Sequence, residues 1–186
     1  PVYKNEIMLG NPNSSGTAYL MLATLVQDMG EEAAFAYMKA LNANVTSYAR
    51  SGIGPINSVK RGDVAFGSTV LHGVINEIVQ GFPVKAVLPC EGVGYEVGSM
   101  AIIKGTRNLE AARKFVDWAL TPDAQKIGLE LKEYAIPTNR DVPLPSMVPN
   151  LTDIKLIHYD FAKYGSSETR KRLLARWEKD INAAAR

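Results

Sequence analysis

The stretch from Glu6 to Thr17 reads EIMLGNPNSSGT, and it contains a strand, a turn and the start of a helix. Glu6 to Gly10 is predicted to be a short strand, and turn-forming residues from Asn11 to Ser15 follow it. A helix is predicted from about Thr17 to Met29, because apolar residues recur there at helical spacing. The chain therefore opens with a strand, a turn and a helix.

Strands and helices alternate along most of the remaining chain. Further strands are predicted at Val45–Tyr48, Val64–Gly67, Val84–Leu88 and Val97–Ile103, the second of them as a buried strand. Helices are predicted at residues 31–41, 57–61, 70–79 and about 167–185, and also after the caps Asn108 and Thr121. This alternation is typical of an α/β fold with a largely parallel sheet flanked by helices. Such sheets bind ligands where the carboxyl ends of strands meet helix N-termini.

The composition is that of an ordinary soluble globular protein, with 46% apolar and 22% charged residues among 186. No run of 18 apolar residues occurs, so no membrane-spanning segment is predicted. The net charge is +2, and the basic residues are scattered apart from a run at Arg170–Arg172. We interpret that run as the solvated face of a helix, and no nucleic-acid partner is expected.

Motifs of catalytic and metal sites are absent from the sequence. His72 and His158 are the only histidines and Cys90 is the only cysteine, which is too few for a closed zinc site. No nucleophile elbow, metalloprotease motif or paired-cysteine motif occurs. The sequence therefore predicts a protein that is not an enzyme, with no catalytic residue, no metal and no cofactor.

Ser14, Ser15, Gly16 and Thr17 form the most informative candidate site. They stand at a helix N-terminus, which presents free backbone N–H groups and a partial positive charge. Hydroxyl groups add further donors, and glycine lets a ligand approach the backbone closely. Because no acidic residue follows until Asp28, this helix start suits an incoming phosphate, phosphonate or carboxylate. An ordinary serine N-cap explains the same pattern equally well.

Further candidate residues follow other predicted strands. Ser68 and Thr69 come after the predicted buried strand, and Ser51 lies in the polar segment after the strand at 45–48. Glu91 stands in a glycine-rich loop, where it can pair with an amine or hydroxyl of a ligand. Tyr95 can stack on a ligand or donate its hydroxyl. Caps, turns and packing explain each of these residues about equally well.

Five segments resemble known proteins in their order and spacing. They read NPNSSGTAY (11–19), GDVAFG (62–67), PCEG (89–92), the run from Ala101 to Ala124, and IPTN (136–139). The chain resembles family 1 extracellular solute-binding proteins, in the branch that binds ferric iron, 2-aminoethylphosphonate or hexose phosphates. The resemblance implies a type II periplasmic-binding-protein fold that closes on its ligand by hinge bending. It also implies a periplasmic or extracytoplasmic location and an ABC permease in the membrane as partner.

The resemblance also implies a division of the chain. Members of the family are considerably longer, so the first lobe is expected to be incomplete. Residues 1–88 are expected to form the main part of the second lobe. Residues 89–145 are expected to return toward the first lobe, and residues 146–186 to form a helical part that packs on the second. An exposed hinge face is then expected to cause self-association.

The ligand expected from these features is a small oxyanion-bearing solute, a phosphonate or an organophosphate. Iron-binding members of the family carry adjacent tyrosines after the strand that matches Val64–Gly67, and this chain has Ser68 and Thr69 there. Ferric iron is therefore the alternative rather than the first expectation. An enzyme acting on a phosphorylated substrate is the alternative from another functional class.

Overall fold

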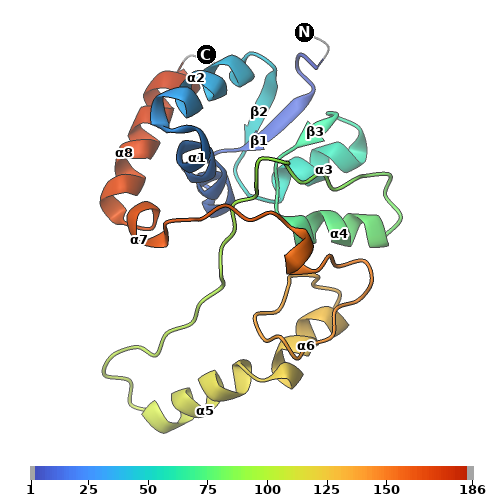
Figure 1. The fold of residues 1–186 in the computed structure, drawn as a ribbon, viewed down its shortest axis with the longest axis vertical. Coiled ribbons are helices and arrows are strands. Elements are labelled where there is room, and N and C mark those ends of the chain that lie inside the picture. The colour runs from blue at the N-terminus through green and yellow to red at the C-terminus, as the bar shows by residue number, and fades with distance from the viewer. Residues whose placement is uncertain (1–2, 184–186) are drawn as a thin grey trace. The chain divides into compact units, whose positions relative to one another are not determined.

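The computed structural model describes residues 3–183, and the chain divides into two compact units. Unit 1 comprises Pro1–Tyr95 and Ile154–Arg186, and unit 2 comprises Glu96–Asp153. Figure 1 shows the helices and strands along the chain.

A three-stranded parallel sheet lies at the centre of unit 1. Its strands are β1 (Ile7–Gly10), β2 (Val45–Ala49) and β3 (Phe66–Gly67), in the order β2-β1-β3. Helices connect each strand to the next, as parallel pairing requires. The predicted α/β fold with a parallel sheet flanked by helices is confirmed.

The third strand differs from its prediction. The sequence predicts a buried strand over Val64–Gly67, whereas the observed strand has two residues and only Val64 of that segment is buried. Phe66 is 46% exposed. The order of the sheet gives β3 a single neighbour, β1, so one edge of the strand is left uncovered.

Three helices enclose the hydrophobic core of unit 1. They are α1 (Gly16–Met29), α2 (Glu31–Asn42) and α8 (Ser167–Trp177), which lie together in Figure 1. Leu22 of α1, Ala34 of α2 and Leu173 of α8 are completely buried. Gly30, at φ 81°, ends α1 and permits the turn into α2. The predicted final helix changes to a π-helix at Glu178–Asn182, and residues 184–186 lie outside the described part.

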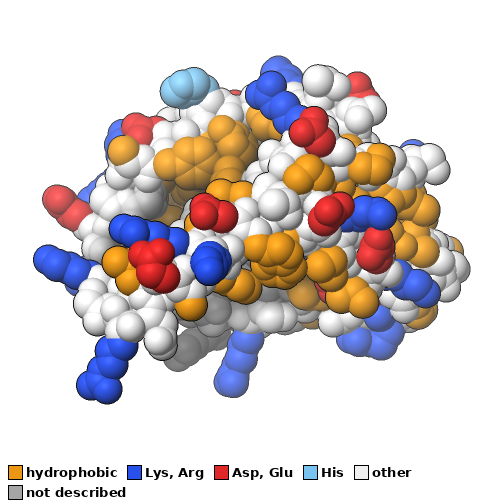
Figure 2. All heavy atoms as spheres, turned by 90° about the horizontal axis from the view of Figure 1, so that it is seen from below, with side chains coloured by type: hydrophobic (Ala, Val, Ile, Leu, Met, Phe, Trp, Pro, Cys, Tyr) orange, Lys and Arg blue, Asp and Glu red, His pale blue; other side chains and the backbone are white. Residues whose placement is uncertain are grey.

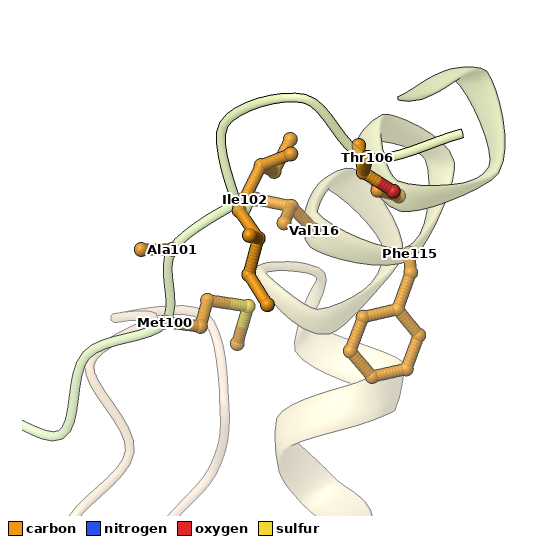
Figure 3. A pocket seen from close by; sticks show the side chains of 8 residues that line it. Met100, Ala101, Ile102, Thr106, Phe115 and Val116 are labelled. Atoms are coloured by element: carbon orange, nitrogen blue, oxygen red, sulfur yellow. The ribbon is translucent and has the colours of Figure 1, made fainter. Parts of the chain in front are cut away.

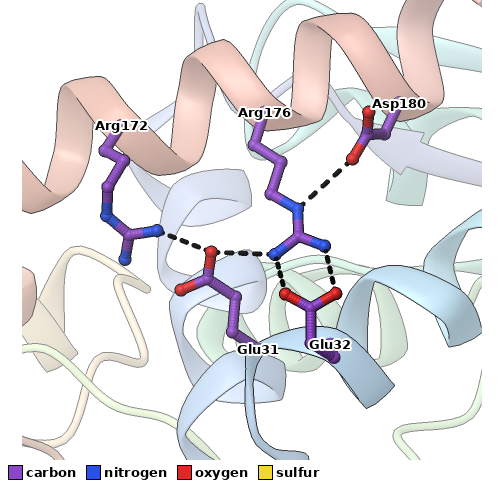
Figure 4. A network of polar contacts seen from close by, with 5 residues as sticks. All are labelled: Glu31, Glu32, Arg172, Arg176 and Asp180. Atoms are coloured by element: carbon purple, nitrogen blue, oxygen red, sulfur yellow. Dashed lines mark hydrogen bonds and ion pairs between the residues drawn. The ribbon is translucent and has the colours of Figure 1, made fainter.

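An ion-pair network joins α2 to α8 (Figure 4). The guanidinium of Arg176 contacts Glu31 at 2.9 Å, Glu32 at 2.7 Å and Asp180 at 3.2 Å, and Arg172 contacts Glu31 at 2.6 Å. Hydrogen bonds from Arg172 and then Arg176 lower the pKa of the Glu31 carboxyl.

The basic run at Arg170–Arg172 is therefore not simply a solvated face. Arg172 takes part in this network, and the guanidinium of Arg170 lies 4.4 Å from the centre of the Tyr19 ring. Two of the three basic side chains in the run thus contact other parts of unit 1.

Two shorter helices, α3 (Gly54–Arg61) and α4 (Leu71–Val79), follow β2 and β3. Lys60 of α3 and Glu77 of α4 form an ion pair at 2.9 Å, and Glu77 is only 7% exposed. This pair ties the two helices together. The short helix α7 (Phe161–Tyr164) precedes α8.

Unit 2 contains α5 (Leu109–Ala119), α6 (Pro122–Glu130) and a short 3-10 helix at Leu151–Asp153. The Thr121 hydroxyl caps α6 as predicted, by accepting from the amide of Ala124 at 3.3 Å. Asn108 occupies the N-cap position of α5, but its side chain makes no capping hydrogen bond. No residue of α5 is buried, although the helix is strongly amphipathic.

The predicted strands at Val84–Leu88 and Val97–Ile103 are wrong for this structure. The first segment lies in unit 1 and the second in unit 2, and neither forms regular secondary structure. A strand persists only where a neighbouring strand pairs with its backbone groups, and neither segment has such a partner among residues 3–183.

Candidate functional site

The N-terminus of α1 follows directly from the end of β1. The carbonyl of Asn11 accepts hydrogen bonds from the amides of Ser14 at 3.1 Å and Ser15 at 2.9 Å, which closes the turn. Ser15 is the N-cap, and its Oγ accepts from the amide of Ala18 at 3.2 Å. This is the serine cap that the sequence allowed, and it leaves the next two amides open.

Those two amides belong to Gly16 and Thr17. Neither has a hydrogen-bond acceptor among residues 3–183, and the Thr17 hydroxyl also makes no hydrogen bond there. The first turn of α1 carries no acidic residue, and Gly16 is exposed. The helix start therefore offers unpartnered donors and a partial positive charge to solvent.

The ends of the other two strands meet this helix start. The Ser14 hydroxyl donates to the carbonyl of Arg50, directly after β2, at 2.8 Å. A Cβ on Gly52 would lie 2.5 Å from the hydroxyl oxygen of Thr17, so the two residues are in close contact. The Thr69 hydroxyl, after β3, donates to the carbonyl of Gly52 at 2.6 Å. The carboxyl ends of all three strands thus converge at one place.

Some of the predicted site residues use their polar groups in hydrogen bonds within the fold, and others keep unpartnered donors. The hydroxyl protons of Ser14 and Thr69 are used in the bonds just described. Ser51 Oγ accepts from the amide of Gly54 at 3.1 Å, at the start of α3. The Ser68 amide donates to the carbonyl of Met8 at 3.3 Å, and its hydroxyl has no partner among residues 3–183. We call the open donors of Gly16, Thr17 and Ser68, with the capping Ser15, the serine cluster.

Glu91 and Tyr95 make no direct contact with the serine cluster. No hydrogen bond, ion pair or ring contact within the described residues joins either of them to it. The Tyr95 ring packs against Phe161 with ring centres 5.3 Å apart. The neighbouring Gly94 lies against Thr24, which is eight residues and about 12 Å further along α1 than Gly16.

Glu91 is exposed and ionised at neutral pH. A hydrogen bond from its own backbone amide, and then one from the Cys90 thiol, lowers the pKa of this carboxyl. Glu91 therefore presents a carboxylate, which accepts hydrogen bonds from an amine or a hydroxyl.

Sequence reasoning did not assign Gly52 or Arg50 to the site. Gly52 contacts Thr17 and accepts from Thr69, and only the assembled fold reveals this position. Arg50 follows β2 and is exposed, and its side chain forms no ion pair with residues 3–183. In the sequence, the position of Arg50 directly after a predicted strand could have identified it as a site residue, because the carboxyl ends of parallel strands lie at one edge of the sheet.

A hollow of about 250 Å³ lies elsewhere, within unit 2 (Figure 3). Met100 and Ile102 line it from the extended segment, and Phe115 and Val116 line it from α5. Thr106 contributes the one hydroxyl of its lining side chains. This hollow is apolar and does not suit an anion.

Among residues 3–183, no three side chains of His, Cys, Asp or Glu group closely enough to bind a metal ion. Within the same residues, no helix has both the length and the apolar character needed to cross a membrane.

Two solved structures are similar to this chain over almost its whole length. One is the periplasmic binding protein AfuA from Actinobacillus pleuropneumoniae with exogenous fructose-6-phosphate bound. It has a TM-score of 0.91 and 43% identity over 98% of this chain and 57% of that chain. The other is the periplasmic binding protein P5PA, with a TM-score of 0.87 and 40% identity over 97% of this chain and 58% of that one.

An uncharacterized protein of Haemophilus influenzae is 40% identical over 99% of this chain and 54% of its own length. The chain therefore spans little more than half the length of each of these three similar proteins. The family model described as "Bacterial extracellular solute-binding protein" matches residues 1–164. The matching family and structures are solute-binding proteins rather than enzymes, and they are located outside the cytoplasm. On this match the chain belongs to the bacterial extracellular solute-binding protein family.

Proposed function

We propose that this chain is part of the substrate-binding component of an ABC importer and that its solute carries a phosphate or phosphonate group. The observation that carries the proposal is the pair of unpartnered amides of Gly16 and Thr17 at an acid-free helix start. A phosphate dianion has several acceptor oxygens and is stabilised by such donors. The hydroxyls of Thr17, in the first turn of α1, and of Ser68, directly after β3, supply further donors.

A phosphorylated sugar is the solute that we favour. The similarity to AfuA with fructose-6-phosphate bound supports this choice, at 43% identity. In the proposal the serine cluster holds the phosphate, and the Glu91 carboxylate accepts hydrogen bonds from sugar hydroxyls. Tyr95 contributes mainly by packing, since its ring contacts Tyr159 and Phe161.

The permease is the second partner in this proposal. A binding component delivers its solute to a membrane permease, and the family membership supports that role for this chain.

The proposal is tested by an NMR titration of the chain, which detects weak binding. Fructose 6-phosphate is compared with fructose, 2-aminoethylphosphonate, inorganic phosphate and ferric citrate. We expect fructose 6-phosphate to shift the amide signals of Gly16 and Thr17, and fructose to leave them unchanged. Affinity is expected to be weak, because an incomplete site makes fewer preorganised contacts to offset the entropic cost of association.

The other ligands decide between the alternatives. Equal shifts with fructose and fructose 6-phosphate, or shifts that avoid the start of α1, would show that the serine cluster is only a capped helix. Stronger shifts with 2-aminoethylphosphonate would keep the anion site but replace the sugar phosphate as its solute. Visible absorbance on addition of ferric citrate would favour iron.

A further inference from the structure

Arg50 stands where β2 ends, beside the start of α1. Its backbone carbonyl accepts a hydrogen bond from the Ser14 hydroxyl at 2.8 Å, which holds the backbone of this residue against the turn before α1. Two residues further along the chain, Gly52 is in close contact with Thr17 and accepts from Thr69 at 2.6 Å. Arg50 therefore belongs to the segment that borders the serine cluster.

The side chain of Arg50 is exposed, and within residues 3–183 it takes part in no ion pair, hydrogen bond or ring contact. The next basic residues along the chain are engaged, since Lys60 pairs with Glu77 at 2.9 Å and Arg61 pairs with Asp63 at 2.6 Å. An extended arginine side chain spans about 7 Å, as the lengths of its bonds allow. The guanidinium can therefore reach a ligand held at the serine cluster without any change in the backbone.

The serine cluster balances only part of the charge of a phosphate group. Its amide and hydroxyl donors are neutral, and the N-terminus of a helix contributes about +0.5 elementary charge. A phosphate monoester carries a charge of about −1.5 to −2 at neutral pH. Among residues 3–183, no hydrogen bond or ion pair brings a lysine or arginine side chain to the residues of the cluster.

Two other charged side chains approach the start of α1, and neither supplies the missing charge. The carboxylate of Glu178 accepts from the side-chain amide of Asn13 at 2.9 Å, so it brings negative charge to the turn before the cap. Arg170 packs on α1, but its guanidinium lies over the ring of Tyr19, 4.4 Å from the ring centre and beyond the open amides. A doubly charged anion at the cluster therefore needs a further cation.

From this placement we propose that Arg50 gives the site its preference for a doubly charged phosphate, an inference that rests on the proposed function. The amides of Gly16 and Thr17 bind part of the phosphate group. The planar Arg50 guanidinium donates two parallel hydrogen bonds to the oxygens that remain. A sulfate ester has nearly the same shape but a single negative charge, so it gains less from Arg50.

An NMR titration with fructose 6-phosphate and fructose 6-sulfate tests the role of Arg50. We expect the unmodified chain to bind the phosphate more tightly than the sulfate. Arg50→Met should weaken binding of the phosphate roughly tenfold or more, the loss expected for a hydrogen bond between charged groups, and should weaken binding of the sulfate less. Arg50→Lys keeps the charge but not the paired geometry, so its affinity should lie between the two and the preference for phosphate should remain.

Lys39→Met is the matched control, because it also removes one exposed positive charge. Lys39 stands near the end of α2, which leads into the other end of β2, and this variant should bind both ligands like the unmodified chain. The Arg50 variants keep the backbone carbonyl that Ser14 contacts, so the fold at the start of α1 should be unchanged.

The possible outcomes separate this inference from the proposed function. Equal phosphate affinity in Arg50→Met and the unmodified chain, or an unchanged preference over sulfate, would overturn the role of Arg50 and leave the anion site standing. An equal loss in Lys39→Met would also overturn it, because net charge alone would then explain the effect. If fructose 6-phosphate does not shift Gly16 and Thr17 in the unmodified chain, the proposed function and the role of Arg50 both fail.

Discussion

At the scale of single residues, the glycines of the site have different roles. A Cβ added to Gly16 would meet nothing within 4 Å, whereas one added to Gly52 would meet Thr17 at 2.5 Å. Gly16 is therefore needed only if a ligand approaches its backbone, whereas Gly52 is needed by the fold itself. Substitutions at the two glycines can therefore distinguish an effect on ligand binding from an effect on the stability of the fold.

Gly16→Ala is expected to weaken ligand binding without loss of stability. Alanine in the first turn of a helix is favoured over glycine by roughly 0.5–1 kcal/mol, so the melting temperature should stay constant or rise. The added methyl group occupies the path of a phosphate toward the open amides. Thermal unfolding and the fructose 6-phosphate titration, measured on the same variant, check both statements. Unimpaired binding would place the phosphate elsewhere.

Gly52→Ala is expected to reduce both stability and ligand binding. The new Cβ would displace the Thr17 side chain and disturb the Thr69 bond to the Gly52 carbonyl. Overpacking of this kind typically costs about 1–3 kcal/mol. Gly98→Ala is the matched control, because nothing lies within 4 Å of its added Cβ and its φ is not positive. Urea unfolding compares the denaturation midpoints of the two variants. Equal midpoints would contradict the structural role assigned to Gly52.

At the scale of secondary-structure elements, charge holds α2 and α8 together in addition to the core. Glu31 and Glu32 stand in the first turn of α2, where carboxylates also complement the helix dipole. The Arg176 guanidinium forms ion pairs with both carboxylates and also with Asp180. This arrangement makes the contact between α2 and α8 dependent on pH.

The stability of unit 1 is expected to fall in acid. The pKa values of Glu31 and Glu32 are lower in the folded chain than the unfolded value of 4.5, chiefly through hydrogen bonds from Arg172 and Arg176 respectively. Their contribution is therefore complete above about pH 4.5 and is lost as the pH falls through the folded values. Arg176→Met should lower the melting temperature by about 2–4 °C at neutral pH and reduce its pH dependence.

A matched arginine tests whether this effect is specific. Arg113 forms an exposed pair with Glu110 at 3.1 Å within α5, so Arg113→Met should change the melting temperature little. Thermal unfolding at pH 7 and pH 3 compares the two variants with the unmodified chain. Equal pH dependence in all three proteins would show that the network contributes nothing measurable.

At the scale of the whole molecule, the chain exposes a large amount of apolar surface. Figure 2 shows hydrophobic side chains on one face in patches between charged ones. In unit 2, Ile103 is 81% exposed, Phe115 59% and Trp118 48%. The chain spans 54–58% of the similar proteins reported above, so those proteins contain additional residues that can cover such surface.

Self-association is expected from this surface. Contiguous exposed apolar patches promote contacts between copies of a protein. Sedimentation velocity over a range of concentrations should show species larger than the monomer, and Ile103→Glu with Phe115→Glu should reduce them. Lys104→Glu, beside Ile103 in sequence, controls for a change of charge alone. A monomer at every concentration would contradict the expectation.

The α/β class, the parallel sheet, most helix boundaries and the family could all be predicted from the amino-acid sequence. These features depend on local periodicity, on caps such as Ser15 and Thr121, and on motifs that need no knowledge of distant contacts. The sequence also identified Ser14 to Thr17 as polar residues at a helix start.

Which of these residues keep unpartnered donors depends on contacts between distant parts of the chain. The Ser15 cap accepts from the amide of Ala18. The Ser14 hydroxyl donates to the carbonyl of Arg50, 36 residues away in sequence, and the Thr69 hydroxyl donates to the carbonyl of Gly52, 17 residues away. Such pairings have no local signal. The strands expected at 84–88 and 97–103 failed for the same reason, because strand formation depends on a partner that local sequence does not specify.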